Sequence, residues 1–172
     1  MRKYFLHTHR LSFGTWNHDD IPLARSLWGD KDVTKYISAT GTFSEENILS
    51  RLSTEIKNYE TYNIQYFPIF ETATGDFIGC CGLRPYVDDD TTLEIGFHLK
   101  KEFWGKGFAT EAATAMIKYA FETLNKEKLF AGHNPKNEAS RKTLKKLGFI
   151  YTHDEFYAPT GLMHPSYIKT KM

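Results

Sequence analysis

The sequence has little of three features that would indicate a special environment: cysteine, net charge and long apolar runs. Among its 172 residues are two cysteines, and 22 Lys and Arg nearly balance 21 Asp and Glu. Because the net charge is only +1, no broad positive field is available to attract nucleic acid or an anionic membrane. We therefore expect no nucleic-acid partner and no membrane partner, and any basic site must be local.

The two cysteines, Cys80 and Cys81, are adjacent, and neighbouring side chains of a strand point to opposite faces of a sheet. They are therefore poor candidates for a disulfide with each other. The segment from Met1 to Leu11 is short and interrupted by basic side chains, unlike a signal peptide, and no apolar run of membrane-spanning length follows it. We expect a cytoplasmic protein.

The length and the hydrophobic content of 41% suit one packed core, so we predict a single domain over residues 1–172. Asp19-Asp20-Ile21-Pro22 predicts the start of a helix and Gly29 its end, and Thr42-Phe43-Ser44-Glu45 has the spacing of a capping box at the start of another. Short apolar runs at 66–70, 77–83 and 93–99, separated by turn residues, predict an antiparallel meander.

The rest of the chain also contains both predicted helices and predicted strands. Apolar residues with three-four spacing predict a long helix from Ala109, and an Asn before a basic amphipathic segment predicts another helix over residues 137–147. Further strands are predicted at 4–14, 128–132, 149–157 and near 166–170. Together these patterns predict an α/β structure with a mixed sheet.

The most informative segment lies between the strand at 93–99 and the long helix. It reads Trp104-Gly105-Lys106-Gly107-Phe108-Ala109-Thr110-Glu111-Ala112. Two glycines let the backbone approach a ligand closely, and the unpaired amides of a first helical turn lie at the positive end of the helix dipole, so the junction suits a phosphate. Two glycines alone would be better explained by a tight turn with a solvated Lys106.

A second motif supports the phosphate interpretation: Asn137-Glu138-Ala139-Ser140 followed by Lys146-Leu147-Gly148-Phe149. In order and spacing, the two motifs resemble the GNAT superfamily of N-acetyltransferases, whose pyrophosphate loop, Q/R-x-x-G-x-G/A, corresponds to residues 104–109. Trp104 stands at the position of that Gln or Arg. With Trp104, the pattern W-G-x-G-[YF]-A-[TS]-E-A followed by a later N-x-x-S is similar to that of the ribosomal-protein N-acetyltransferase branch, the RimJ/RimL-like enzymes.

The resemblance implies a GNAT fold, a mostly antiparallel mixed sheet of about seven strands with splayed fourth and fifth strands, and acetyl-CoA as co-substrate. Its pantetheine arm is expected to pair with the fourth strand and to meet Asn137, while its pyrophosphate meets the glycine loop. The implied cofactor-binding residues are Phe97, His98, Leu99, Trp104, Gly105, Lys106, Gly107, Phe108, Ala109, Thr110 and Asn137. Asn137 is equally explained as a helix cap, and Phe97 and Leu99 as core residues.

Two residues are predicted to be catalytic. Ser140, on the first turn of its helix, is placed to hydrogen-bond the cofactor sulfur as the thiolate leaves, or is an ordinary serine of that turn. Many GNAT enzymes use a tyrosine for this task, and Leu144 stands at that position here. Glu94 is a candidate to accept the amine proton, or else pairs with a basic neighbour.

Other polar residues are weaker candidates. His98 and His133 are single histidines, which are usually packed or solvated. Asp88-Asp89-Asp90 lacks the alternating spacing of a calcium loop, so we expect a solvated turn and no metal site. Glu111 is expected to pair with the helix dipole or a basic residue rather than with phosphate.

The expected reaction is acetyl transfer from acetyl-CoA to a primary amine, with a protein or peptide α-amine as the favoured acceptor. Small-molecule amines, such as an amino acid, a polyamine or an aminoglycoside, remain an alternative, as does a non-catalytic CoA-binding module. The family resemblance is compatible with a homodimer.

Overall fold

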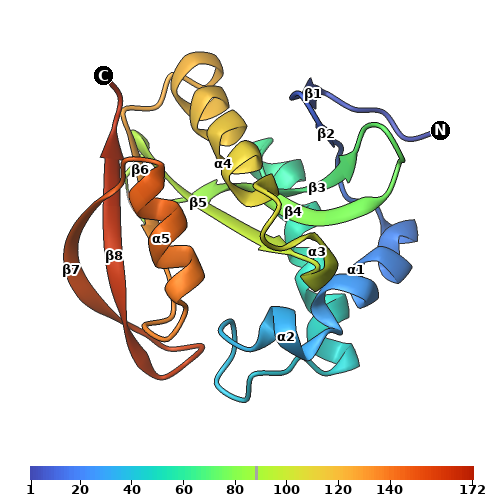
Figure 1. Cartoon of the computed structure of the whole chain (residues 1–172), viewed down its shortest axis with the longest axis horizontal. Coiled ribbons are helices and arrows are strands. Elements are labelled where there is room, and N and C mark those ends of the chain that lie inside the picture. The colour runs from blue at the N-terminus through green and yellow to red at the C-terminus, as the bar shows by residue number, and fades with distance from the viewer. Residues whose placement is uncertain (88) are drawn as a thin grey trace.

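The computed structural model describes residues 1–87 and 89–172 and contains an open sheet of eight strands in the order β1-β2-β3-β4-β5-β6-β8-β7 (Figure 1). All neighbouring strands are antiparallel except β5 and β6, which are parallel. The mixed, mostly antiparallel sheet confirms the predicted fold class. The strands are β1 (Leu6–His7), β2 (Leu11–Phe13), β3 (Tyr66–Glu71), β4 (Phe77–Pro85), β5 (Thr92–Leu99), β6 (Lys128–Gly132), β7 (Ile150–Tyr157) and β8 (Leu162–Thr170).

The helices flank this sheet. They are α1 (Ile21–Trp28), α2 (Lys31–Thr34), α3 (Glu45–Tyr62), α4 (Phe108–Lys118) and α5 (Glu138–Lys146), with 3-10 turns at His18–Asp20 and Lys101–Phe103 and a π-helical turn at Tyr119–Thr123. None of the helices in the described part of the chain has the length and apolar character needed to cross a membrane.

The first predicted strand, over residues 4–14, is wrong in detail because the chain turns back within it. Thr8 donates its amide to the carbonyl of Leu11 at 2.9 Å, and its hydroxyl accepts the Leu11 amide at 3.0 Å. This turn divides the segment into β1 and β2, which pair with each other. The division accounts for eight strands instead of about seven.

The predicted limits of α1 are confirmed, whereas α3 is capped two residues later than expected. Ser44, and not Thr42, is the N-cap residue, and its hydroxyl accepts the Asn47 amide at 3.1 Å. The side-chain carbonyl of Asn47 accepts the Ser44 amide at 3.0 Å in return. Asn47 thus completes the capping box in the place of the predicted Glu45, because an amide oxygen can accept the same bond.

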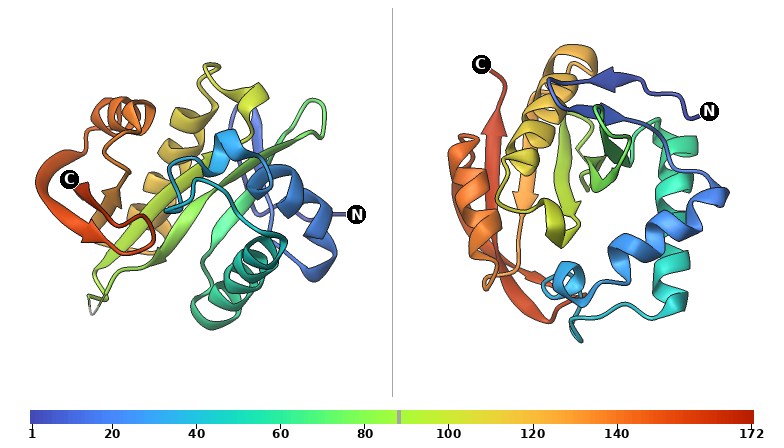
Figure 2. Two further views of the ribbon diagram at one scale, coloured as in Figure 1. Left: turned by 90° about the horizontal axis from the view of Figure 1, so that it is seen from below. Right: turned by 45° about the vertical axis from the view of Figure 1, so that its right-hand side comes forward.

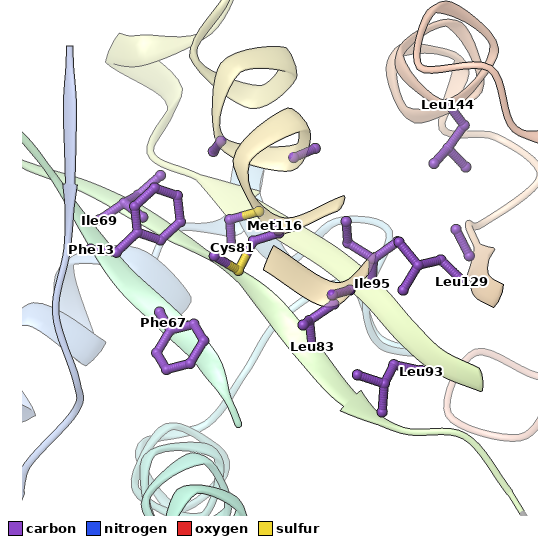
Figure 3. Packing of buried hydrophobic residues seen from close by; sticks show 14 of the residues in the cluster. Phe13, Phe67, Ile69, Cys81, Leu83, Leu93, Ile95, Met116, Leu129 and Leu144 are labelled. Carbon is purple, nitrogen blue, oxygen red and sulfur yellow. The ribbon is translucent and has the colours of Figure 1, made fainter. Parts of the chain in front are cut away.

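Two hydrophobic cores lie on opposite faces of the sheet. Alternate residues of β4 and β5 pack against α4 on one face, where Met116 lies next to Cys81 (Figure 3). The other face of β3 and β4 packs against α1 and α3, and this second core includes Cys80 of β4 and Trp28 of α1. Figure 2 shows α4 separated from α1 and α3 by the central strands. The two adjacent cysteines therefore point to opposite faces, as the strand period predicts.

The central feature of the sheet is that β5 and β6 separate. Their parallel pairing covers only Thr92 to Glu94 on β5, whereas β5 pairs with β4 as far as Leu99. Beyond Glu94 the two strands therefore diverge, as the yellow-green and orange ribbons of Figure 1 show. This divergence corresponds to the predicted splay of the fourth and fifth strands, with numbers shifted by the extra N-terminal strand.

The acidic turn before β5 is described in part, because Asp88 lies outside the described residues. The Asp89 carboxylate accepts hydrogen bonds from the Thr91 amide at 2.9 Å and from the Thr91 and Thr92 hydroxyls at 2.6 and 2.7 Å. These bonds lower the Asp89 pKa to about 2. Asp89 thus serves to shape the turn that leads into β5.

Candidate functional site

A cavity of about 800 Å³ opens where β5 and β6 separate. Phe97 lines it from the α4 face of β5, and Glu94 and His98 line it from the other face, so the cavity continues through the gap between the strands. We call its two parts the loop side and the arginine side. The loop side consists of Trp104, Gly105, Gly107, Phe108, Ala109, Thr110, Asn137 and Ser140, and the arginine side of Arg51, Tyr66, Arg84 and Glu94.

The loop side is made mainly of backbone. Gly105 and Gly107 have φ angles of +72° and +82°, the left-handed region that glycine adopts without strain. Gly107 is the N-cap residue of α4, and no side chain caps this helix. Because the first amides of a helix have no partner within it, the amides after Gly107 are available to an anion in the cavity.

A free strand edge adjoins this loop. One edge of β5 is paired with β4, while the opposite edge beyond Glu94 has no strand beside it in the described residues. Phe97, His98 and Leu99 lie on that edge and line the cavity. Because the bonds to β4 alternate along β5, His98 directs its backbone groups toward Cys80, whereas Phe97 and Leu99 direct theirs toward the free edge. Those groups can hydrogen-bond an extended amide-containing ligand as a neighbouring strand would.

Two residues of the glycine motif have different surroundings. Trp104 donates its indole N–H to the Leu99 carbonyl at 2.8 Å, which holds the loop against the end of β5. The Lys106 ammonium lies 5.8 Å from the ring of Phe103, and Lys106 is not among the residues that line the cavity. Of the predicted cofactor-binding residues, Lys106 alone is placed outside the cavity wall.

Asn137 and Ser140 meet at the start of α5. The Asn137 side chain accepts the Ser140 amide at 3.1 Å, which is the predicted helix cap. Both residues line the cavity, and so does Leu144, which is otherwise buried in the α4-side core and contributes no polar atom. The Ser140 hydroxyl is therefore a polar group that α5 can offer to a ligand from its first turn.

Glu111 supports the loop from behind. Its carboxylate accepts the Thr8 hydroxyl at 2.6 Å, the Arg10 amide at 2.8 Å and the Arg10 Nε at 2.7 Å. Arg10 also donates to the Lys106 carbonyl at 2.9 Å and lies over the Phe108 ring. Burial alone would raise the Glu111 pKa, but the Thr8 and Arg10 bonds outweigh it and lower the pKa. The predicted structural role of Glu111 is thus that of a brace between β1–β2 and the loop.

Glu94 lies on the arginine side among groups from several elements. The Tyr66 hydroxyl of β3 is 3.5 Å from its carboxylate, and Arg84 of β4 is its direct cross-strand partner. Burial raises the Glu94 pKa, while the charges of Arg84 and Arg51 oppose the rise. A half-buried carboxylate with a raised pKa is a stronger base than an ordinary glutamate, which suits it to accept a proton.

The acetyltransferase (GNAT) domain family matches residues 10–150 of this sequence. The chain belongs to the GNAT acetyltransferase family. It is 32% identical over 146 residues to the uncharacterized N-acetyltransferase p20 of Bacillus licheniformis, covering 84% of this chain and 81% of that protein. It is 28% identical over 158 residues to the FsC-acetyl coenzyme A-N(2)-transacetylase of Aspergillus fumigatus, covering 88% and 67%.

Solved structures share this GNAT fold. The structure of RimL, the ribosomal L7/L12 α-N-protein acetyltransferase, in complex with coenzyme A superposes with a TM-score of 0.81 over 98% of both chains, at 13% identity. At that identity the likeness shows the fold alone. Together with the family match, it makes this chain an acyltransferase of the N-acetyltransferase family.

Tyr66, Arg51 and Arg84 were not predicted as site residues from the sequence. A signal for Tyr66 was present in Gly96, since a glycine inside a strand often marks a close approach. A Cβ atom at Gly96 would lie 2.2 Å from the Tyr66 hydroxyl oxygen. The hydroxyl thus lies over the face of β5 where Gly96 leaves room for it. No local pattern connects the two arginines.

The single histidines and the cysteines have well-defined packing roles. His98 accepts the Trp28 indole N–H at its Nδ1 at 3.1 Å, and burial lowers its pKa well below the usual value, so the ring is neutral. His133 is buried, lies 2.7 Å from the Asn134 carbonyl and stacks on Tyr167. Burial raises the pKa of Cys80 to about 12, so this thiol is not a nucleophile at neutral pH.

Proposed function

We propose that this chain binds acetyl-CoA in the cavity between β5 and β6 and transfers the acetyl group to a primary amine, preferentially the α-amine of a protein or peptide. One observation carries the proposal: the uncapped amides at the start of α4 and the free edge of β5 line the same cavity. A pyrophosphate and an amide-containing arm, joined in one molecule, match these two features.

The residues present fit such a ligand. A Cβ atom added at Gly105 would meet nothing within 4 Å, so the space in front of the loop is open to a bound group. The loop contributes backbone donors without a side chain that would compete for them. The coenzyme A complex of RimL, a protein of the same fold, supports the assignment.

When bound, acetyl-CoA supplies a thioester carbonyl that an amine can attack directly. Glu94 accepts the proton that the amine must lose, directly or through water. The Ser140 hydroxyl donates a hydrogen bond to the sulfur as it departs. The cavity brings both residues to a single space from opposite sides, β5 on one and α5 on the other. No covalent enzyme intermediate is required.

The preference for an α-amine rests on proton chemistry. An α-amine has a pKa near ~8 and a lysine side chain one near ~10.4, so at pH 7 about a tenth of the former is neutral but less than a thousandth of the latter. With Leu144 in place of a tyrosine and Glu94 as the proposed proton acceptor, the site suits the amine that loses its proton more easily.

Calorimetry and a thiol-release assay test the proposal. We expect acetyl-CoA to bind far more tightly than inorganic phosphate and to raise the melting temperature. Peptides with a free amino terminus should release coenzyme A faster than the same peptides with an acetylated terminus and an internal lysine. Binding of acetyl-CoA no tighter than phosphate would contradict the cofactor assignment, and faster reaction of lysine would contradict the acceptor assignment.

A further inference from the structure

Two arginines on the arginine side are poorly satisfied by the protein itself. Arg51 of α3 and Arg84 of β4 both line the cavity, with 15% and 27% of their side chains exposed. The buried Nε and Nη2 atoms of Arg51 and the buried Nε of Arg84 have no hydrogen-bond partner among residues 1–87 and 89–172. Since a buried N–H without a partner is costly, the two guanidinium groups are suited to receive an acceptor group.

The charges near these arginines are incompletely matched. Both guanidinium groups share one oxygen of Glu55, at 3.6 Å from each, which is too long for a good hydrogen bond. The Glu55 carboxylate is fully buried, and its other oxygen is used by the Tyr66 amide at 2.8 Å. One buried carboxylate therefore faces two guanidinium groups.

The Tyr66 ring fixes the position of both groups. The guanidinium carbons of Arg51 and Arg84 lie 5.1 and 4.4 Å from the centre of this ring. The hydroxyl of the same tyrosine lies 3.5 Å from the Glu94 carboxylate on β5. The arginines are thus held beside the carboxylate to which the proposed function assigns the amine proton.

We propose that Arg51 and Arg84 bind a carboxylate that the acceptor carries close to its reacting amine. This inference rests on the proposed acetyl transfer and specifies its acceptor class. A guanidinium group recognises a planar carboxylate through paired N–H donors. The group comes either from a free α-amino acid or from an acidic side chain at the start of a peptide.

Charge complementarity supports a zwitterionic acceptor. The two arginines and the carboxylates of Glu94 and Glu155 all line the cavity. A ligand with one ammonium and one carboxylate meets opposite charge at both ends, with its ammonium near the glutamates and its carboxylate near the arginines. A polyamine would add only positive charge beside two guanidinium groups, which is unfavourable in a half-buried site.

Matched acceptors that differ only in a carboxylate test the proposal. The α-carboxylate is tested with alanine against alaninamide, and the side-chain carboxylate with Asp-Ala-amide against Asn-Ala-amide. For at least one pair, we expect the wild type to prefer the acid by about tenfold or more in kcat/KM. The pair that shows the preference identifies the source of the carboxylate. Equal rates within both pairs would overturn the proposal.

Variants of the arginines assign the effect. Arg84→Gln and Arg51→Gln should abolish the preference for the acid when both acceptors of a pair are compared at a pH above the acidic limb of the rate profile. Arg25→Gln is the control, because Arg25 also pairs with a glutamate, Glu45, but on the exposed surface of α1. A preference that survives in both variants would contradict the assignment.

The double variant Glu55→Gln/Arg84→Gln guards against misfolding, because it removes one charge of each sign from the buried cluster. Acetyl-CoA binding and the melting temperature report whether each variant is folded. Calorimetry of both acceptor pairs with coenzyme A-loaded protein provides a readout that needs no turnover. Tighter binding of an acid than of its amide without turnover would contradict the proposed function alone, whereas equal binding within both pairs would contradict the carboxylate site.

Discussion

The two sides of the cavity are built from different parts of the polypeptide. The loop side depends on backbone: two glycines with positive φ, uncapped helix amides and a free strand edge. The arginine side depends on side chains that come from α3, β3, β4 and β5. A site made of backbone groups can bind the same cofactor in every relative with this fold. A site made of side chains can differ between relatives and so bind different acceptors. The difference explains why one fold can serve many acceptors.

Because the arginine side depends on side chains, we expect conservative substitutions there to cause the largest losses of kcat/KM. Glu94→Gln keeps the shape of the side chain but cannot accept a proton. We expect kcat/KM near pH 6.5 to fall by about 100-fold or more, the usual range for loss of a general base. The defect should shrink as the pH rises toward the pKa of the amine. A deficit that does not change with pH would instead indicate a positioning role.

The surroundings of Glu94 provide a second test of its proton chemistry. Burial raises its pKa and the charge of Glu155 adds to this, while Arg84, Arg51 and the Tyr66 hydroxyl lower it. The acidic limb of the rate profile should therefore lie above the ordinary range of a glutamate, near ~4.3. Glu155→Gln should move that limb to lower pH, and Arg84→Gln should move it to higher pH. Opposite shifts would exclude Glu94 as the titrating group.

The loop side should instead respond to added bulk on its backbone. In Gly107→Val, the side chain would occupy the approach to the α4 amides, and we expect acetyl-CoA binding to weaken about 100-fold, or ~2.8 kcal/mol. Backbone strain must be separated from this effect, since Gly107 has φ of +82°. Gly75→Val is the control, because Gly75 has φ of +79°, does not line the cavity and lies in the β3–β4 turn. Equal loss of binding in both variants would contradict a phosphate site at this loop.

The sequence was sufficient for the loop side because its signals are local. Gly105 and Gly107 are separated only by Lys106, and the helix that follows has a clear apolar period, so the junction of strand, loop and helix could be predicted. Glu94 was reached through the strand pattern and the family resemblance. Arg51, Tyr66 and Arg84 were missed because they meet only when α3 packs on β3 and β4, and no short-range pattern encodes that contact.

Ser140 belongs to the loop side but is proposed to act through its side chain, at the start of α5. Ser140→Ala leaves the amide that Asn137 caps in place, so α5 should remain intact. We expect kcat to fall about tenfold while the Michaelis constant for acetyl-CoA changes little, because the lost bond forms as the thiolate leaves. Ser53→Ala, an exposed change on α3, is the control. Normal kinetics combined with reduced stability would return Ser140 to a structural role.

The smallest effect is expected at Glu111, where side chains support the backbone site without touching the cofactor. Glu111→Gln keeps an acceptor for Thr8 and the Arg10 amide but loses the charge that pairs with the Arg10 guanidinium. We expect a loss of about 1 kcal/mol in unfolding free energy at pH 7 and a few-fold weaker acetyl-CoA binding. Because the folded-state pKa of Glu111 is lowered, its stabilisation is full above the unfolded value of ~4.3 and is lost as the pH falls through the lowered value. The melting curves of the two proteins should therefore converge in acid. Glu122→Gln, which removes an exposed carboxylate 3.9 Å from Lys118, should cost less than about 0.5 kcal/mol at pH 7. If the two variants behaved alike, the Glu111 contacts would contribute no more than a surface ion pair, and side chains would not stabilise the loop side.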